Sequence, residues 1–308
     1  MVYLKNINRI VLLFVLLSCG SNTFSQITYT KSDSIKVVEL LKAGQKRFAD
    51  KENPSDNSSL MLFYGHKLLG IPYVAATLEV NKNEQLVVNL RQLDCTTFVE
   101  TAFALSMTTA QKSVRWADYC ANLKKIRYDE GIMDGYASRN HYFLWWVESN
   151  RKLGLVTTPM DDDYRKRKGK YNSIYKRQII HIDWMSTHSA SYPMLKGNSV
   201  LINEIRNHEK ASDGKEMMSI PRQNLGLSKS RMRWVKNGDI LAICTKKKGL
   251  DTTHIGIAEW GSDGKLHLLN ASQIHKKVVL EPLTLQQYMT RHPTQLGIWV
   301  ISPILPDK

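Results

Sequence analysis

Cysteine is scarce in this chain, with four among 308 residues: Cys19, Cys95, Cys120 and Cys244. An export signal that carries Cys19 away would leave three, too few for a disulfide framework. Cys120 lies in a helical pattern and Cys244 ends an apolar strand, so both are expected in the core as small apolar residues. Cys95 stands where a polar segment turns into an apolar one. That position makes it the candidate for chemistry.

Metal-binding patterns are also missing, because the sequence has no Cys-x-x-Cys pair and no His-Glu-x-x-His motif. Such closely spaced ligands are typical of zinc sites. His181, Asp183 and His188 are near enough in sequence to be imagined as ligands, but scattered surface side chains are the better interpretation. The sequence therefore predicts neither a metal nor a cofactor.

The apolar run near the N-terminus covers only the eight residues from Ile10 to Leu17, whereas a bilayer-spanning helix needs about 20. Lys5 and Arg9 precede this run, as in an export signal. Two processing sites compete. Leu16-Leu17-Ser18-Cys19 resembles a lipobox, which would put a lipid on Cys19, and Thr23-Phe24-Ser25 resembles an ordinary cleavage site, which would make residues 1–25 a signal peptide. Either predicts an exported protein, periplasmic or lipid-anchored in the cell envelope.

Acidic residues are few beside basic ones, 28 against 43, which gives a net charge of +15. Nucleic acid is one partner that such a charge suits, but an exported protein meets little of it. The densest basic run, Arg165 to Lys170, follows three aspartates and is expected as a solvated loop. The charge favours anionic partners by long-range attraction, and we expect no nucleic acid.

Repeats and low-complexity linkers are absent, so residues 26–308 are expected to form a single catalytic domain. Apolar periodicity predicts helices over 33–50, 59–69, 113–126 and 141–153, and a further helix from Cys95. It predicts strands over 239–244, 253–260, 265–271 and 296–302. Helices first and strands last indicate an α+β fold. The polar stretch near 155–235 is periodic only in patches and is interpreted as an insertion.

Cys95 follows Asp94, a natural N-cap, and precedes the apolar helical pattern of Phe98, Val99 and Ala102. The thiol is therefore expected in the first turn of a helix. Unpaired N–H groups and the helix dipole favour a thiolate there, which is the nucleophilic form. The alternative for a free cysteine is a small buried apolar residue.

A candidate base, His254, lies in the alternating segment Asp251 to Trp260, which predicts a strand. Gly256 and Ala258 share its face, which leaves room for a helix end and a substrate. Asn270, on the next predicted strand, is the candidate to orient the imidazole. An odd loop or one bulge would pair Asn270 with His254. His267 is the rival, but it would lie too far along the strand.

The chain has Asp94-Cys95 followed by a helical pattern, then His254-Ile255-Gly256-Ile257-Ala258 opening a strand, then a strand that ends in Asn270-Ala271-Ser272. This order resembles the NlpC/p60 superfamily of cell-wall cysteine peptidases. More narrowly, the runs Leu93 to Glu100, Tyr136 to Tyr142 and Gly249 to Gly256 resemble its branch with N-acetylmuramoyl-L-alanine amidase activity, formerly a domain of unknown function. Gly70-Ile71-Pro72-Tyr73 matches the superfamily's segment ahead of the cysteine. The resemblance implies a papain-like fold of helices on an antiparallel sheet. The 159 residues between Cys95 and His254 (254 − 95) fit a branch that carries insertions.

The resemblance implies a peptidoglycan or muropeptide substrate, whose stem carboxylates suit a basic protein. Cys95, His254 and Asn270 would be catalytic, with Tyr73 and Asp94 lining the active site and Tyr73 a second donor to the oxyanion. Ser138, Arg139 and His141 are candidates for binding the stem peptide, since Arg139 could grip a carboxylate. Two alternatives stay open: a γ-D-glutamyl endopeptidase with the same triad, and a catalytically silent wall-binding lipoprotein.

Overall fold

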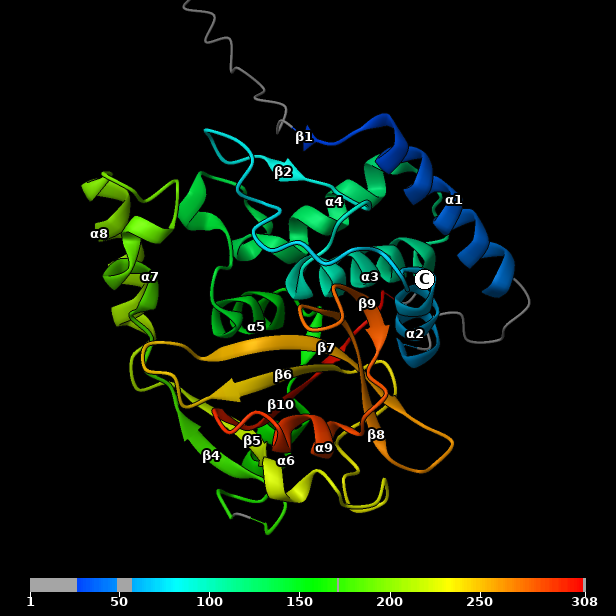
Figure 1. Cartoon of the computed structure of the whole chain (residues 1–308), viewed down its shortest axis with the longest axis vertical. Helices are drawn as coiled ribbons and strands as arrows, with labels where there is room; N and C mark the ends of the chain where they lie inside the picture. Colours follow the sequence, from blue (N-terminus) through cyan, green and yellow to red (C-terminus); the bar gives the residue numbers. More distant parts are fainter. Residues whose placement is uncertain (1–26, 49–56, 171, 307–308) are drawn as a thin grey trace, which may run out of the picture.

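Residues 27–48, 57–170 and 172–306 are described by the computed structural model of the chain (Figure 1). The expected signal segment, with Cys19, lies outside them. Within the described residues there are nine α-helices and an eight-stranded antiparallel sheet, which confirms the α+β class. No helix of this part of the chain is both long and apolar enough to cross a membrane.

The chain alternates between helices and strands along much of its length. The helices are α1 (Lys31–Phe48), α2 (Asn57–Lys67), α3 (Cys95–Ala110), α4 (Trp116–Arg127), α5 (Phe143–Lys152), α6 (Pro159–Lys166), α7 (Trp184–Thr187), α8 (Ser199–Ser212) and α9 (Leu285–Thr290). The strands are β1 (Ile27–Thr28), β2 (Leu86–Val87), β3 (Val156–Thr157), β4 (Lys176–Ile179), β5 (Glu216–Pro221), β6 (Ile240–Thr245), β7 (Thr252–Trp260), β8 (Leu266–Ser272), β9 (Lys277–Leu280) and β10 (Gln295–Pro303).

The main sheet has the strand order β4-β5-β10-β6-β7-β8-β9, and β3 pairs with the end of β10. The last strand of the chain is therefore central, with β5 on one side and β6 on the other. The short strands β1 and β2 form a separate parallel pair.

Helix α3 lies against β7 and β8, with α1, α2 and α4 packed around it (Figure 1). Its side chains from Thr97 onward are all buried, because the sheet and the neighbouring helices enclose it. One apolar cluster, with Phe103, Trp146 and Trp299, fills the space between these helices and the sheet. A second cluster, with Leu268 and Leu285, lies on the opposite face of the sheet against α9.

A buried ion pair joins α3 to α4 inside the helical layer. The guanidinium of Arg127 donates to Glu100 over 2.7 Å, and also to the carbonyl of Val87 over 2.6 Å. Both charged side chains are almost fully buried. Because removing one partner would strand the other charge away from water, the pair fixes how α4 sits on the cysteine helix.

The predicted helices and strands correspond to α1 to α5 and to β6, β7, β8 and β10, with boundaries that differ by a few residues. The stretch 155–235 contains more structure than its pattern indicated. Its strands β4 and β5 extend the main sheet, while α7 and α8 form a lobe beside it (Figure 1). Cys120 and Cys244 are buried, as predicted.

Candidate active site

Cys95 is the first residue of α3, and Asp94 caps this helix as predicted. The Asp94 carboxylate accepts a hydrogen bond from the Thr97 backbone N–H over 2.8 Å, and the Thr97 hydroxyl accepts one from the Asp94 N–H over 2.9 Å. This reciprocal capping box fixes the direction of the chain into the helix. The partly buried thiol is thereby held at the helix start.

The resting state of the thiol differs from the sequence-based expectation. Burial and the nearby Asp94 carboxylate raise the pKa of Cys95 to about 11, and hydrogen bonds from the backbone N–H groups of Ile255 and Thr96 only partly oppose this. The expectation of a resting thiolate is therefore wrong, because desolvation outweighs the helix end. A base has to remove the proton at neutral pH. The hydrogen bond from Ile255 shows that the residue after His254 touches the sulfur.

His254 lies on β7 and is oriented by Asn270 on β8. The imidazole Nε2 and the Asn270 Oδ1 are 2.9 Å apart. The Asn270 amide nitrogen donates to the Leu268 carbonyl over 3.1 Å, so Oδ1 is the end that faces the ring. Nε2 must then carry the proton, which leaves Nδ1 as a base. Burial lowers the pKa of His254 below its usual value, so the ring is neutral near pH 7.

The strand register corrects one detail of the prediction. Trp260 pairs with Leu266 across the five-residue loop 261–265, so the loop is odd, as expected. However, the paired register ends at Ile257 with Leu269, and its continuation places Asn270 opposite Gly256. Direct pairing of His254 with Asn270 is therefore wrong, and the hydrogen bond runs diagonally. The rival His267 lies opposite Glu259 and bonds the Glu281 carbonyl instead.

Gly256 makes the diagonal contact possible. A methyl group on its α-carbon would come within 2.8 Å of both the Leu269 carbonyl oxygen and the Leu268 side chain. Two strands that pair this closely have no space for a side chain between them. The small residues predicted on the face of His254 thus allow the neighbouring strand β8 to approach closely.

Tyr73 approaches the cysteine from the segment before α3. It forms an isolated bridge with Leu93, and its N–H donates to the Lys276 carbonyl over 2.9 Å. Burial, together with the negative charges of Cys95 and Asp94, raises the pKa of the Tyr73 phenol to about 12. The hydroxyl keeps its proton at neutral pH and can therefore act as a hydrogen-bond donor, although Tyr73 does not line the cavity into which Cys95 opens.

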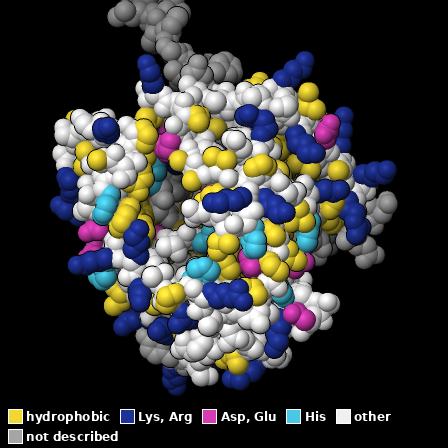
Figure 2. Space-filling view, in the orientation of Figure 1, with side chains coloured by type: hydrophobic (Ala, Val, Ile, Leu, Met, Phe, Trp, Pro, Cys, Tyr) yellow, Lys and Arg dark blue, Asp and Glu magenta, His cyan; other side chains and the backbone are white. Residues whose placement is uncertain are grey.

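Cys95 and His254 open into one cavity of about 200 Å³, here called the Cys95 cavity. Its walls are formed by His141, Tyr142 and Trp146, and by residues of the α7 region such as Met185 and Tyr192. Figure 2 shows the surface hollowed between the α7–α8 lobe and the rest of the molecule. The lobe, which the sequence pattern did not reveal, therefore provides one wall of the site.

The sequence profile of the AmiA-like, N-acetylmuramoyl-L-alanine amidase-like family matches residues 64–298. This chain belongs to that family. The match confirms the resemblance found in the sequence and covers the cysteine, the histidine and the lobe between them.

Solved structures similar to this AmiA-like chain come from several bacteria. An N-acetylmuramoyl-L-alanine amidase from Bacteroides uniformis is 34% identical, with a TM-score of 0.72 over 80% of this chain and 99% of its own. A Bacteroides fragilis protein to which a xylanase activity was ascribed is 36% identical, with a TM-score of 0.69 over 77% and 98%. A Legionella pneumophila protein of family DUF1460, 20% identical with a TM-score of 0.61 over 89% and 98%, shows the fold alone. Among curated proteins, none matches the sequence.

Among the predicted substrate-binding residues, His141 lines the Cys95 cavity. Its Nε2 lies 2.8 Å from the Tyr136 carbonyl. Burial and the Arg139 charge lower the pKa of His141 well below its usual range, so it presents a neutral ring.

Ser138 and Arg139 do not line the Cys95 cavity. Ser138 closes a turn, because its hydroxyl donates to the Gly135 carbonyl over 2.7 Å. Arg139 is buried and forms ion pairs with Glu79 and, at 3.7 Å, with Glu84. Its guanidinium is thus already paired with two carboxylates, so Arg139 has a structural role in this fold.

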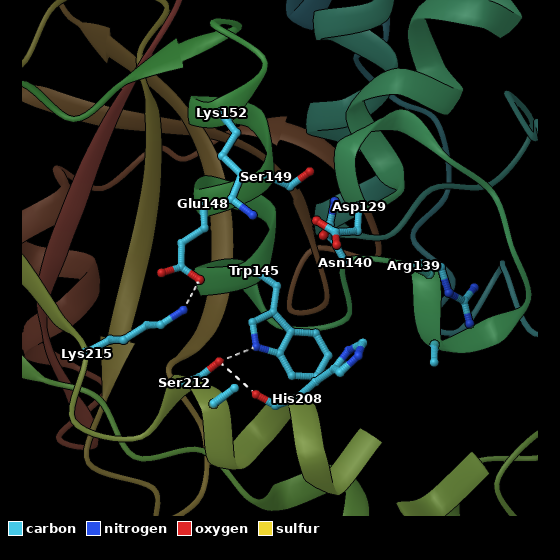
Figure 3. Close-up of a pocket in the computed structure, with 12 residues that line it drawn as sticks. Asp129, Arg139, Asn140, Trp145, Glu148, Ser149, Lys152, His208, Ser212 and Lys215 are labelled. Atoms are coloured by element: carbon cyan, nitrogen blue, oxygen red, sulfur yellow. Dashed lines mark hydrogen bonds and ion pairs between the residues drawn. The ribbon is translucent and has the colours of Figure 1, made fainter. Parts of the chain in front are cut away.

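Arg139 lines a neighbouring cavity of about 180 Å³, with Trp145 at its centre (Figure 3). The Trp145 indole donates to the Ser212 hydroxyl over 2.7 Å, and Lys215 pairs with Glu148 over 2.7 Å. Asn140 lines both this cavity and the Cys95 cavity. The residue that joins the two spaces is therefore Asn140, next to the arginine that the sequence singled out.

Asp251 is a positioning residue that the sequence motif contained but did not explain. Its carboxylate accepts hydrogen bonds from the Leu144 N–H over 2.7 Å and from the Thr252 N–H over 2.6 Å. Leu144 is in the first turn of α5, whose free N–H groups favour an acidic partner. One buried side chain thus ties the start of the histidine strand to the helix that carries the cavity's aromatic wall.

The two histidines considered above as metal ligands, His181 and His188, have other partners. His181 bonds Asp213 over 2.6 Å, and the His188 ring stacks on Trp184 with centroids 3.7 Å apart. Across residues 27–48, 57–170 and 172–306, no group of three His, Cys, Asp or Glu side chains is arranged to hold a metal ion.

Proposed function

We propose that this protein is a cysteine-dependent amidase, which hydrolyses the bond between the lactyl group of N-acetylmuramic acid and L-alanine in peptidoglycan or muropeptides. The observation that carries the proposal is the orientation of neutral His254 by Asn270 beside the protonated Cys95 thiol. The Bacteroides uniformis amidase, alike over four fifths of the chain, supports the choice of bond. The helices on an antiparallel sheet would correspond to the papain-like NlpC/p60 arrangement.

The chemistry of the site suits acyl transfer better than glycoside hydrolysis. A thiol paired with an imidazole attacks a carbonyl carbon. Glycosidases instead use two carboxyl groups on either side of the glycosidic bond. Among the described residues that line the Cys95 cavity are the Cys95 thiol, the His254 imidazole and a single carboxylate, Asp251, which already accepts two backbone hydrogen bonds.

In the first step, the Cys95 sulfur attacks the lactyl carbonyl while its proton passes to Nδ1 of His254. The Asn270 oxygen keeps its hydrogen bond to Nε2–H, which holds the ring through the transfer. The oxyanion would be met by the Cys95 N–H, one of the unpaired donors at the start of α3, and by the Tyr73 hydroxyl. Losing one such donor typically costs about a hundredfold to a thousandfold in rate.

In the second step, the imidazolium gives its proton to the alanine nitrogen as the C–N bond breaks, leaving a thioester on Cys95. His254 then takes a proton from water, and the resulting hydroxide attacks the thioester. As the C–S bond breaks, the imidazolium returns this proton to the sulfur, which restores the thiol, and the lactyl group leaves as a free carboxylic acid that ionises in water. The neutral resting state of both groups means that each proton taken is returned within the cycle.

The proposed substrate agrees with the charge of the chain. Peptidoglycan stems carry carboxylates, and basic side chains are spread over the face shown in Figure 2. Long-range attraction would draw such substrates to the protein. An exported location, periplasmic or anchored by a lipid on Cys19, is part of this proposal.

The test is mass spectrometry of defined muropeptides after incubation with the protein, beside Cys95→Ala. We expect free stem peptide that begins at L-alanine, together with the muramyl sugar, and no product from Cys95→Ala. A cut after D-glutamate would instead indicate the endopeptidase. Muropeptide that stays bound and intact with both proteins would indicate a wall-binding role.

A further inference from the structure

A further cavity of about 350 Å³ lies on the α9 side of the catalytic strands and is here called the Glu281 cavity. Apolar and aromatic side chains, two histidines, one arginine and one carboxylate line it: Ile274, His275, Glu281, Pro282, Leu283, Tyr288, Arg291 and His292. It shares no lining residue with the Cys95 cavity. It is therefore a separate space for a ligand.

The strand register connects the Glu281 cavity to the catalytic groups. Asn270 pairs with Val279, and two residues further on, the Glu281 N–H donates to the Leu268 carbonyl over 2.9 Å. Cross-strand neighbours point to the same face of a sheet. Glu281 thus shares a face with Asn270, which holds His254.

Electrostatic interactions agree with this proximity. The Glu281 carboxylate acts to raise the pKa of His254, while His292 acts to lower it. A thiolate on Cys95 would in turn raise the pKa of Tyr288. Groups that line the Glu281 cavity are thus within electrostatic reach of both Cys95 and His254.

Glu281 is buried, with 3% of its surface exposed, and its Oε2 accepts no hydrogen bond. His275, an exposed residue, places Nε2 3.2 Å from this oxygen as an ion-pair partner only. A buried carboxylate oxygen without a donor is costly, so native structures rarely leave one without a role. Glu281 lines a cavity, where a ligand that offers O–H or N–H groups would satisfy this oxygen.

We propose that the Glu281 cavity binds the amino sugar of the substrate, with Glu281 Oε2 accepting a hydrogen bond from a sugar hydroxyl or acetamido N–H. This inference rests on the proposed function. The Tyr288 and His292 rings, with centroids 4.6 Å apart, and the Leu283 side chain offer an apolar wall for the C–H face of a sugar ring.

The same carboxylate decides the direction of the substrate. A stem peptide carries carboxylates of its own, which a buried glutamate would repel. The neutral, donor-rich sugar is the half of the substrate that Glu281 can accept. The sugar therefore lies toward α9, and the stem extends into the Cys95 cavity toward Asn140.

The test measures binding to protein that carries Cys95→Ala, so that nothing is consumed. Two ligands are compared by calorimetry: N-acetylmuramoyl-L-alanyl-D-glutamate, and lactoyl-L-alanyl-D-glutamate, which lacks the sugar. We expect Glu281→Gln to lower the affinity for the muramyl ligand by about tenfold to a hundredfold, which is the usual effect of losing a hydrogen bond to a charged group. Affinity for the lactoyl ligand should stay unchanged. Glu216→Gln, an exposed carboxylate paired with Arg177 on the far edge of the sheet, is the matched control.

His292→Ala removes part of the apolar wall and should show the same selectivity, which keeps the test valid if Glu281→Gln fails to fold. Equal weakening of both ligands, or no weakening of either, would overturn the subsite. Hydrolysis by the Cys95 enzyme is a separate readout. Selective sugar binding without any hydrolysis would leave the subsite standing and reject the amidase. If the enzyme hydrolyses the substrate equally well with Glu281→Gln or His292→Ala, the amidase stands and the subsite is rejected.

Discussion

At the scale of single residues, the site depends on which nitrogen of His254 carries the proton. Asn270 decides this, because its own amide is fixed by the Leu268 carbonyl. The residue types could be predicted from the sequence, since Cys95 follows an N-cap residue and His254 shares its strand face with the small residues Gly256 and Ala258. The protonation state of the thiol could not be predicted from the sequence, because it depends on burial that only the fold creates.

The pH dependence of catalysis follows from the direction of the His254 pKa. Protonated His254 cannot accept the Cys95 proton, so kcat/KM should fall as the pH drops through a value below 6.5. The hydrogen bond to Asn270 acts to raise this pKa. Asn270→Ala should therefore move the acid limb to lower pH while reducing the rate at neutral pH. A pH–rate profile measures both effects. An acid limb that moves to higher pH in the variant would contradict this assignment.

At the scale of elements, the pair β7 and β8 shows what local pattern could and could not predict. Alternation located both strands and an odd loop, but the diagonal contact depends on a register that the loop residues set. The segment 155–235 was predicted worst. Strand β4 and helix α7 have only four residues each, and β5 is buried on both faces, so none of them shows an alternation long enough to recognise.

Gly256→Ala tests the close approach of the two strands. The added methyl group would sit 2.8 Å from the Leu269 carbonyl, and overpacking of this kind typically destabilises by about 1–3 kcal/mol. We expect a lower unfolding midpoint in urea and a loss of activity larger than the stability change explains, because Asn270 moves with β8. Gly261→Ala is the control, since its methyl group would meet the movable side chain of Asp263 in the loop. Full activity in Gly256→Ala would show that the register tolerates a wider spacing.

At the scale of the whole molecule, stability should depend on pH through Asp239, which precedes β6. Burial raises the pKa of this carboxyl to about 7, although the Lys236 N–H donates to it over 2.7 Å. In the unfolded chain it titrates near its ordinary value of 3.8. Between these values the folded state holds the proton more tightly, so its contribution to stability falls as the pH rises from about 4 to 7.

Asp239→Asn removes this titration and keeps an oxygen to accept from Lys236. The variant should melt at a higher temperature than the wild type at pH 8, and the difference should vanish near pH 4. Thermal unfolding followed by circular dichroism at both pH values measures it. A difference that is the same at both would point to packing rather than ionisation.

The position of β10 has a consequence for how the main sheet holds together. This strand follows the other strands of the sheet along the chain, yet it alone joins β4 and β5 to the β6–β9 half. The two halves can therefore pair into one sheet only when β10 is in place between them. A change that weakens β10 loosens its pairing with β5 and with β6 at the same time, so damage at one strand is felt on both sides of the sheet.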